Sequence, residues 1–340
     1  MAKRIGKQSV KFDKSISIKS TAATVGPKEG EGPLGKYFDV VLEDILAGEK
    51  SWEKAESKIV SNNMKLAVEK SKIGMDKIDY ILAGDLLNQG SGSNYGVRDF
   101  NIPFFGLYGA CSTFGESMCL GGILIESGAA ENVLVGASSH FCAAEKQFRF
   151  PLDLGTQRPL TTTWTVTGDG AAVLSNEDNS PYITAITTGK MVDLGITDAN
   201  NMGAAMAPAA AQAICSNFKD FDITPDYYDL IITGDLGKVG MELTTKLLKE
   251  EGYDISKNFT DCGVEIFDPV SQDTHAGGSG CACSATVFSS YFYEKVKRGE
   301  LKRILFVPTG ALMSSTSVQQ GESIPGIAHA AVIENKRGNN

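Results

Sequence analysis

The feature that most constrains the fold of this chain is an internal repeat. Three apolar runs occur twice and in the same order: Ile81–Leu86 and Ile231–Leu236, Val133–Gly136 and Ile304–Val307, Ala171–Leu174 and Ala330–Ile333. The first run of each set passes through the same Gly-Asp dipeptide, Gly84-Asp85 and Gly234-Asp235. Three runs repeated in the same order predict two copies of a single folding unit.

Each copy alternates short apolar runs with longer helical stretches, which is typical of a sheet covered by helices on both faces. We expect helices at residues 52–72, 111–127, 204–218, 239–251 and 278–298. The polar cluster Asn176–Pro181 predicts the join between two closely packed halves, residues 1–178 and 179–340. Two stretches look inserted: residues 26–50, expected to cap a site or lie on the surface, and residues 313–326.

Composition excludes several classes of function. The 340 residues are 42% hydrophobic and 21% charged, as in ordinary globular proteins, and the net charge of −9 argues against nucleic-acid binding. The seven cysteines form no CxxC pair and no zinc-ligand spacing, so we expect reduced thiols. No apolar run approaches the roughly 20 residues that span a bilayer, and no hydrophobic signal region is present, which predicts a soluble protein with at most peripheral membrane contact.

The segment Gly109–Gly115 places a cysteine, Cys111, at the start of a helix of small and apolar residues. The first turn of a helix has unpaired N–H groups and partial positive charge, so we expect Cys111 to ionise more readily than a free cysteine. Taken alone, Cys111 fits a small buried hydrophobe better than a reactive thiol. Two later segments bear on the choice: Gly168–Leu174, a turn leading into an apolar strand, and His275–Gly280, a histidine before a glycine-rich helix start.

In this order and spacing, the three segments resemble the thiolase and β-ketoacyl synthase superfamily over nearly the whole chain. The resemblance implies a duplicated five-layered α/β/α/β/α fold with an internal pseudo-dyad, usually assembled as a homodimer. It also implies that Cys111 holds the position of the nucleophile and His275 that of an assisting base, with a helix N-terminus behind it that helps to bind negative charge. The structural alternative for His275 is a helix-capping residue in a loop.

The third catalytic group of the superfamily is missing. Condensing members carry a histidine, and degradative thiolases an asparagine-containing motif, after the strand that ends here at Gly234; this chain continues Asp235–Lys238. The second cysteine of degradative thiolases is replaced by Pro308–Ala311. We therefore expect a degenerate site with no catalytic residues and no cofactor. An acyl-transferring enzyme that uses Cys111 is the alternative, and a scaffold with a vestigial pocket is a third.

Two further histidines have weaker assignments. His140 follows a strand at its carboxyl end, the edge where open α/β sheets bind ligands, and is expected either to line the pocket or to have a structural role. His329 lies inside the last predicted strand and is expected to be a core or interface residue.

Four segments resemble a non-condensing branch of the superfamily, the stage V sporulation proteins of spore-forming Firmicutes: Pro27–Gly35, Tyr108–Thr113, Arg158–Gly168 and Asp273–Gly280. This resemblance implies a non-enzymatic subunit of the spore's dipicolinate channel complex, at the inner membrane of the developing spore. It would bind dipicolinic acid (pyridine-2,6-dicarboxylate), alone or as its calcium chelate. We expect the ligand-binding residues to be Cys111, His275, Gly278, Ser279, His140, Thr309 and Gly310.

A planar aromatic dianion needs N–H donors, a cation and an apolar wall. The helix starts at Cys111 and Gly278 are expected to supply the donors. Phe114 or Phe141 is a candidate for the wall. The candidate cations are Arg149, Arg158 and Lys238, and either Asp169 or Asp235 could assist a calcium ion, although Asp169 also fits a turn residue.

Overall fold

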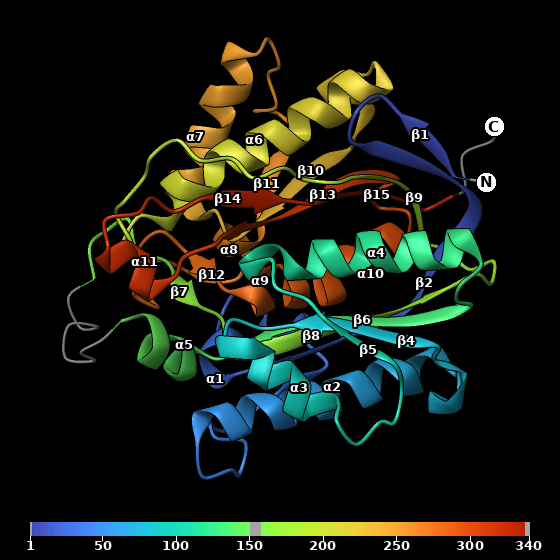
Figure 1. Ribbon diagram of the computed structural model, residues 1–340, viewed down its shortest axis with the longest axis horizontal. Helices are drawn as coiled ribbons and strands as arrows, with labels where there is room; N and C mark the ends of the chain where they lie inside the picture. The colour runs from blue at the N-terminus through green and yellow to red at the C-terminus, as the bar shows by residue number, and fades with distance from the viewer. Residues whose placement is uncertain (1, 150–157, 337–340) are drawn as a thin grey trace.

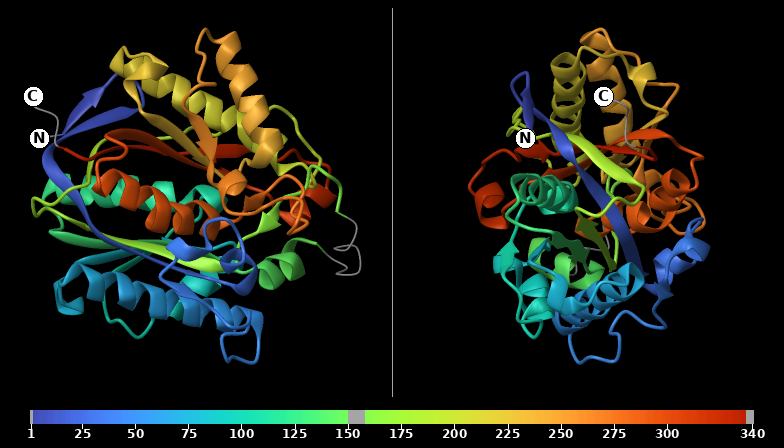
Figure 2. Two further views of the ribbon diagram at one scale, coloured as in Figure 1. Left: turned by 180° about the vertical axis from the view of Figure 1, so that it is seen from behind. Right: turned by 90° about the vertical axis from the view of Figure 1, so that its right-hand side faces the viewer.

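Five layers of helices and sheet strands are stacked in the computed structural model, which describes residues 2–149 and 158–336 (Figure 1). One outer layer contains α6 (Met202–Phe221) and α7 (Gly237–Glu250), and the other contains α2 (Trp52–Ser71) and α3 (Ser91–Val97). The central layer is formed by α4 (Thr113–Ser127), α9 (Cys281–Val287) and α10 (Tyr293–Lys297), and the end view in Figure 2 shows it between the strands. This confirms the predicted five-layered α/β/α/β/α fold.

The strands follow one order, β11-β10-β13-β15-β9-β2-β8-β6-β4-β5. Their bounds are β2 Ser9–Val25, β4 Tyr80–Gly84, β5 Phe104–Gly106, β6 Asn132–Ser139, β8 Gly168–Ser175, β9 Tyr182–Thr187, β10 Leu230–Gly234, β11 Phe259–Asp261, β13 Arg303–Ala311 and β15 Ala330–Glu334. β4 is parallel to β5 and β6, and β6 is antiparallel to β8. β10 is likewise parallel to β11 and β13, and β13 is antiparallel to β15. The three repeated runs of the sequence therefore form strands at equivalent places.

The long strand β2 connects the two sets of strands. Its first residues pair with β9, and the stretch from Ser17 to Val25 pairs with β8. The connection from β8 to β9, residues 176–181, coincides with the predicted join. Shorter strands complete the sheet: β1 (Lys3–Ile5) and β3 (Val40–Val41) pair with β2, and β14 (Gly326–Ala328) pairs with β13.

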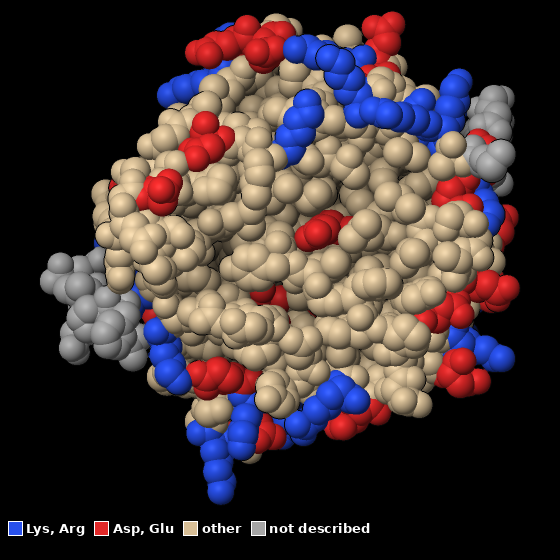
Figure 3. Space-filling view, in the orientation of Figure 1, with Lys and Arg blue, Asp and Glu red and all other residues tan. Residues whose placement is uncertain are grey.

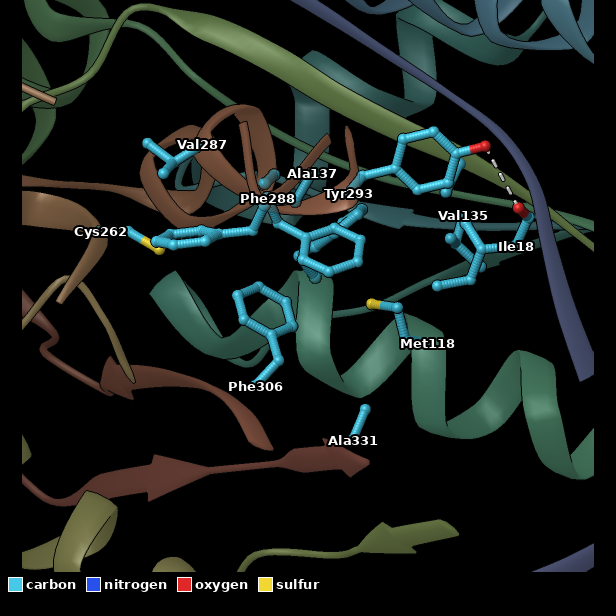
Figure 4. Packing of buried hydrophobic residues seen from close by; sticks show 14 of the residues in the cluster. Ile18, Met118, Val135, Ala137, Cys262, Val287, Phe288, Tyr293, Phe306 and Ala331 are labelled. Atoms are coloured by element: carbon cyan, nitrogen blue, oxygen red, sulfur yellow. Dashed lines mark hydrogen bonds between the residues drawn. The ribbon is translucent and has the colours of Figure 1, made fainter. Parts of the chain in front are cut away.

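The central layer is packed by aromatic side chains (Figure 4). The rings of Phe288 and Phe306 are stacked with centroids 4.6 Å apart, and Phe114 contacts both of them at 6.0 Å and 6.2 Å. All three side chains are fully buried. Aromatic pairs at these separations add to the stabilisation from burial. Phe114 is thus a core residue, and its proposed place in the wall of a ligand pocket is wrong.

Four of the five predicted helices are present with small shifts at their ends, as α2, α4, α6 and α7. The helix predicted at residues 278–298 is wrong at its start. Gly278–Ser279 forms the short strand β12, which pairs with β7 (Trp164–Thr165), and α9 begins only at Cys281. Gly277 and Gly280 have φ angles of 115° and 97°, which are incompatible with a right-handed helix. A π-helical turn, η7 (Phe288–Phe292), then separates α9 from α10.

The stretch predicted as an insertion at residues 26–50 folds into α1 (Pro27–Gly30), the turn η1 (Gly35–Tyr37) and β3. It is tied to the rest of the chain, because Glu29 is buried and accepts the N–H of Thr167, and the Lys28 amine donates to the Gln272 carbonyl at 2.6 Å. The second stretch, residues 313–326, contains α11 (Ser315–Gln319). The remaining elements are α5 (Phe141–Phe148), α8 (Cys262–Glu265) and the short turns η2 (Met75–Lys77), η3 (Asn88–Gly90), η4 (Ala110–Ser112) and η6 (Pro225–Tyr227).

Candidate ligand pocket beside Cys111

Cys111 lies in a sharp turn between β5 and α4. The turn is the 3-10 element η4, and Ala110 within it has a φ of 48°, an unfavourable value for a residue with a side chain. Gly310 on β13 packs against this turn so closely that a Cβ atom there would lie 2.1 Å from the Gly109 carbonyl oxygen. The end of β13 therefore holds the turn, and with it Cys111, in a fixed place.

The half-buried Cys111 side chain faces a cavity of about 120 Å³, which is several times the space needed for one water molecule. The walls come from the ends of several elements: Leu86, Tyr108, Ala110, Cys111, Ala144, Glu145, Phe148, Arg149, Thr163, Thr165, Ala199, Asn200, Met202, Met206, Ser279, Gly280, Ala311 and Met313. Cys111 and Ser279 are the two predicted site residues that this cavity brings together.

The predicted residues on β12 and β13 lie one or two positions away from the wall. Gly280 lines the cavity instead of Gly278, which packs against the side chains of Ile266 and Phe267. Ala311 lines it instead of Thr309 and Gly310. Thr309 is fully buried and its hydroxyl donates to the Val307 carbonyl at 3.0 Å.

His275 is not part of the cavity wall. Its Nδ1 atom lies 3.0 Å from the Pro159 carbonyl and its Nε2 atom lies 3.1 Å from a carboxylate oxygen of Asp273. Both ring nitrogens thus have partners in the loop that precedes β12. The structure does not bring His275 and Cys111 together in the cavity, and His275 does not cap a helix either, because α9 begins at Cys281 with Gly280 before it.

The other two histidines also lie outside the cavity wall. His140 is buried at the start of α5, where Nε2 lies 2.7 Å from the Ile45 carbonyl and Nδ1 accepts the N–H of Ala143. Burial lowers the pKa of His140. His329 lies between β14 and β15, not inside a strand, and its Nδ1 accepts the N–H of Gly189. Burial lowers its pKa to about 4.

Of the three candidate cations, Arg149 lines the cavity and Arg158 and Lys238 do not. Arg149 follows α5, and its Nε atom lies 3.2 Å from the carboxylate of Glu145, another wall residue. Arg158 is bound to Asp273 and lies over the Trp164 ring, 5.1 Å from its centroid. Lys238 is exposed near the start of α7. The cavity therefore contains a paired positive and negative charge.

The apolar walls differ from the prediction. Phe141 is stacked on Trp164, with ring centroids 3.8 Å apart, and does not face the cavity. The walls are formed by Tyr108, Phe148 and three methionines, which sequence reasoning missed. Thr163 and Thr165 could have been found from the segment Arg158–Gly168, because alternate residues of a strand point to the same side. Met202 and Met206 lie one turn apart on α6, whereas Met313 comes from the distant segment after β13, and the sequence does not show that these segments meet.

The surroundings of Cys111 raise the pKa of its thiol, whereas the sequence predicted a lowered pKa. Burial raises the pKa of the Cys111 thiol well above its usual value, and the nearby Asp235 carboxyl raises it further. A hydrogen bond from the Gly280 backbone acts in the other direction but is the smaller effect. The prediction that the helix start favours a thiolate is therefore wrong, since loss of solvent outweighs the helix dipole.

Neither of the carboxylates proposed to assist calcium lines the cavity. Asp169 is buried on β8, where it accepts a hydrogen bond of 2.7 Å from the Asn63 amide. Asp235 is buried at the end of β10. Within residues 2–149 and 158–336, no group of His, Cys, Asp or Glu side chains has the arrangement of a metal site.

Comparison with known proteins identifies the family. Residues 6–334 match the sequence profile of the family described as stage V sporulation protein AD (SpoVAD). The chain is also 46% identical over 336 residues to stage V sporulation protein AD of Bacillus subtilis, with 99% of each chain covered. The chain belongs to the SpoVAD family. The resemblance predicted from the four segments is thereby confirmed, and membership assigns the chain a role in sporulation.

Several solved structures have a fold similar to that of this chain. The chain is similar to 3-oxoacyl-[acyl-carrier-protein] synthase III of Aquifex aeolicus, with a TM-score of 0.56, 14% identity, and 94% of this chain and 99% of that chain covered. Xanthomonas campestris OleA with bound cerulenin gives a TM-score of 0.59 and 15% identity, with 95% and 99% covered. At these identities the likeness establishes the thiolase-like fold and not an activity.

In the described part of the chain, no helix combines the length and apolar character that crossing a bilayer requires.

Proposed function

We propose that the chain binds dipicolinate in the cavity beside Cys111, as a non-enzymatic subunit of the spore's dipicolinate channel complex. The observation that supports this most directly is Arg149, a cation inside a largely apolar cavity. An arginine fork matches the two oxygens of a carboxylate and makes stronger hydrogen bonds than a neutral donor. A rigid dicarboxylate offers one such group to Arg149 and a second to donors across the cavity.

Those donors are other residues of the cavity wall. The Gly280 backbone points toward the Cys111 sulfur, and the hydroxyls of Ser279 and Thr163 lie 2.7 Å from each other at the edge of the cavity. Either hydroxyl can turn its proton toward a ligand oxygen. The pyridine ring would then lie between the aromatic side chains of Tyr108 and Phe148, in the mixed polar and apolar setting that small planar ligands favour.

Glu145 limits how well the cavity can bind a negatively charged ligand. Its carboxylate is paired with Arg149, so a dicarboxylate must compete with it for the guanidinium. Burial raises the pKa of Glu145, while Arg149 and Arg158 lower it again. We expect Glu145→Gln to tighten dipicolinate binding, because the substitution removes a negative charge and leaves Arg149 free.

Titration calorimetry of dipicolinate, with and without calcium, tests the proposal. We expect Arg149→Gln to weaken binding roughly tenfold or more, the equivalent of about 1.4 kcal/mol. Arg98→Gln is the matched control, because Arg98 is exposed and pairs with Asp99 away from the cavity. His275→Ala is expected to bind as the parent does. Absence of heat in every condition would favour a scaffold with a vestigial pocket.

The alternative is an acyl-transferring enzyme that uses Cys111, and it is favoured by the position of this thiol in the wall of a cavity in a ketoacyl-synthase-like fold. Against it stands the lack of an imidazole among the wall residues that the structure describes. A nucleophilic cysteine needs a base or a lowered pKa, and this site provides neither.

We also propose that the chain forms a homodimer through β5. This strand lies at one edge of the sheet, and Phe105 on it is 50% exposed. The face formed by β5 and α4 is broad and carries few charges, with most charged side chains at its rim (Figure 3). An unpaired strand with exposed apolar side chains is a site for association. We expect Phe105→Asp to convert a dimer into monomers in sedimentation velocity, whereas a parent that is already monomeric would contradict the proposal.

A further inference from the structure

The Asp235 carboxyl is a buried polar group that the proposed binding of dipicolinate does not use. Its side chain is fully buried, and within the described residues neither carboxyl oxygen has a hydrogen-bond partner of ordinary geometry. The backbone is also unfavourable, since Asp235 has a φ of 77°. Both features cost free energy, and such local costs concentrate at functional sites.

The strand ends place this carboxyl next to Cys111. Gly234 is in register with Pro308, so that Asp235 follows at the level of Thr309. The next residue, Gly310, packs against the turn of Cys111, and a Cβ atom on it would lie 3.1 Å from the Cys111 nitrogen. Asp235 and Cys111 therefore lie at neighbouring levels along the end of β13, near enough for the carboxyl to affect the thiol.

The start of α9 covers both groups from the other side. Its first residues approach Cys111, with the Gly280 backbone hydrogen-bonded toward the sulfur. One turn later, Cys283 and Ser284 face Asp235. A Cβ atom on Gly234 would lie 2.4 Å from the Cβ of Ser284, so there is no space for a larger residue or a water layer between β10 and α9. The thiol and the carboxyl share one enclosed region.

Two acidic groups in one enclosed region oppose each other's ionisation. A negative charge on either raises the cost of a negative charge on the other, and low solvent access increases this effect. Burial and the neighbouring Asp261 carboxyl raise the pKa of Asp235 well above its usual value. A histidine at this position could take the proton of the thiol, whereas the Asp235 carboxyl, which ionises before the thiol does, adds a negative charge beside it.

We infer that Asp235 keeps Cys111 in the thiol form and so makes the thiol at the nucleophile position unreactive. Asp235 acts through Cys111 and is a positioning residue for its proton, with no contact to the ligand required. The inference concerns the reactivity of the thiol and stands whether or not dipicolinate is the ligand. It also gives a physical reason for a buried aspartate with an unfavourable backbone at this place.

Other titratable groups face the pair and must stay constant in any test. They are Tyr108 before η4, Cys281 and Cys283 on α9, Cys262 on α8, Asp261 on β11, Asp85 after β4, and Glu145 with Arg149 on the cavity wall. Cys281 is held by a hydrogen bond of 3.0 Å from its thiol to the Ala110 carbonyl. Because these groups are the same in every variant of Asp235, a change between variants reports on Asp235 itself.

Alkylation by iodoacetamide measures the thiolate directly, since the sulfur displaces iodide and only the ionised form reacts at a useful rate. The rate at Cys111 is followed by peptide mass spectrometry between about pH 6 and about pH 10 in the full chain, a window that brackets ordinary cysteine ionisation. The half-exposed Cys142 in α5 is the internal reference, because its pKa responds to burial and Glu145 and not to Asp235.

We expect Asp235→Asn, which has nearly the same shape and no charge, to raise the Cys111 rate near pH 8 by up to about tenfold, the effect of one pKa unit. The Cys142 rate should not change. Asp235→His is expected to raise the Cys111 rate further near neutral pH, because imidazole accepts the proton of the thiol.

Asp169→Asn is the matched control. It places the same substitution at another fully buried carboxyl, which is not among the groups that act on Cys111, and should leave the Cys111 profile unchanged. If Asp235→His does not fold, Asp235→Asn decides the question alone. A Cys111 profile that is unchanged in folded Asp235→Asn would overturn the inference, as would a parent chain in which Cys111 reacts faster than Cys142.

Discussion

Asp85 and Asp235 follow equivalent strands in the two halves of the repeat, yet their surroundings differ. The Asp85 carboxylate accepts the N–H of Leu87 at 2.8 Å and both the N–H and the hydroxyl of Ser93 at 2.7 Å. Among the described residues the Asp235 carboxyl has no such partners, and Asp235 adopts an unfavourable φ. The same dipeptide thus fixes a turn in one half and leaves a free acid beside Cys111 in the other.

Asp235 can lack these hydrogen bonds because another residue, Asp261, fixes the turn in the second half. Asp261, on β11, accepts the N–H groups of Leu236, Gly237 and Gly263 and the hydroxyl of Thr233 at distances from 2.8 to 3.1 Å. These bonds fix the turn that Asp235 begins. Asp235 is therefore not required for the turn, and we attribute its presence to its effect on Cys111.

The largest effect is expected for Asp261→Ala. Removing this carboxylate leaves three buried N–H groups without an acceptor, and we expect a loss of roughly 3–4 kcal/mol in the free energy of unfolding. Urea denaturation followed by circular dichroism measures it. A loss below about 1 kcal/mol, the typical effect of a substitution, would show that another residue fixes the turn and would remove the basis of the comparison.

Asp85→Ala tests the first half in the same way. Two N–H groups and one hydroxyl lose their acceptor, so we expect a loss of about 2–3 kcal/mol, somewhat smaller than for Asp261. The same denaturation experiment checks it. Equal stability of this variant and the parent would mean that the hydrogen bonds of Asp85 do not carry the role assigned to them.

Asp169 shows how a buried carboxyl of the first half responds to pH. Burial raises its pKa to about 8, whereas in the unfolded chain it ionises near its ordinary value. The folded chain holds the proton where the unfolded chain has lost it, so this contribution to stability is full at acid pH and is lost as pH rises toward about 8.

We therefore expect the stability of the parent to fall more steeply between about pH 6 and about pH 8 than that of Asp169→Asn, by roughly 2 kcal/mol. Urea denaturation at the two pH values gives the difference. Parallel pH dependence in both proteins would contradict a protonated Asp169.

The smallest effect is expected for Asp235→Asn. This substitution removes an unpartnered carboxyl and keeps the shape of the side chain, so we expect the unfolding free energy to change by less than about 1 kcal/mol, in either direction. A loss as large as that of Asp85→Ala would show that the two aspartates share a structural role after all.

The repeat, the layers and four of the helices were predictable because each depends on local patterns of apolar residues. The two Gly-Asp turns looked alike in the sequence, and nothing local distinguishes a satisfied carboxylate from a free one. The start of the fifth helix was mispredicted because Gly278 forms a strand with Trp164, a residue more than a hundred positions away. Pairings at that distance leave no local signal.

The candidate site was predictable where a single segment fixes it, as for Cys111 and Ser279. Arg149 was one of three candidate cations that the sequence could not tell apart. His275 was assigned to the pocket on motif order, but the backbone there has a φ of 54° and the ring is held by Asp273 and Pro159. The sequence also predicted the wrong direction for the change in the pKa of Cys111. Helix geometry can be inferred from the sequence, whereas the depth of burial depends on the whole fold.

The central claim is that the pocket can bind a ligand while its thiol does not react. Intact-protein mass spectrometry after incubation with an acyl-coenzyme A at neutral pH tests it most directly. The account predicts that the parent chain keeps its unmodified mass. A stable acyl adduct that is lost in Cys111→Ser would contradict the account and would identify an enzyme.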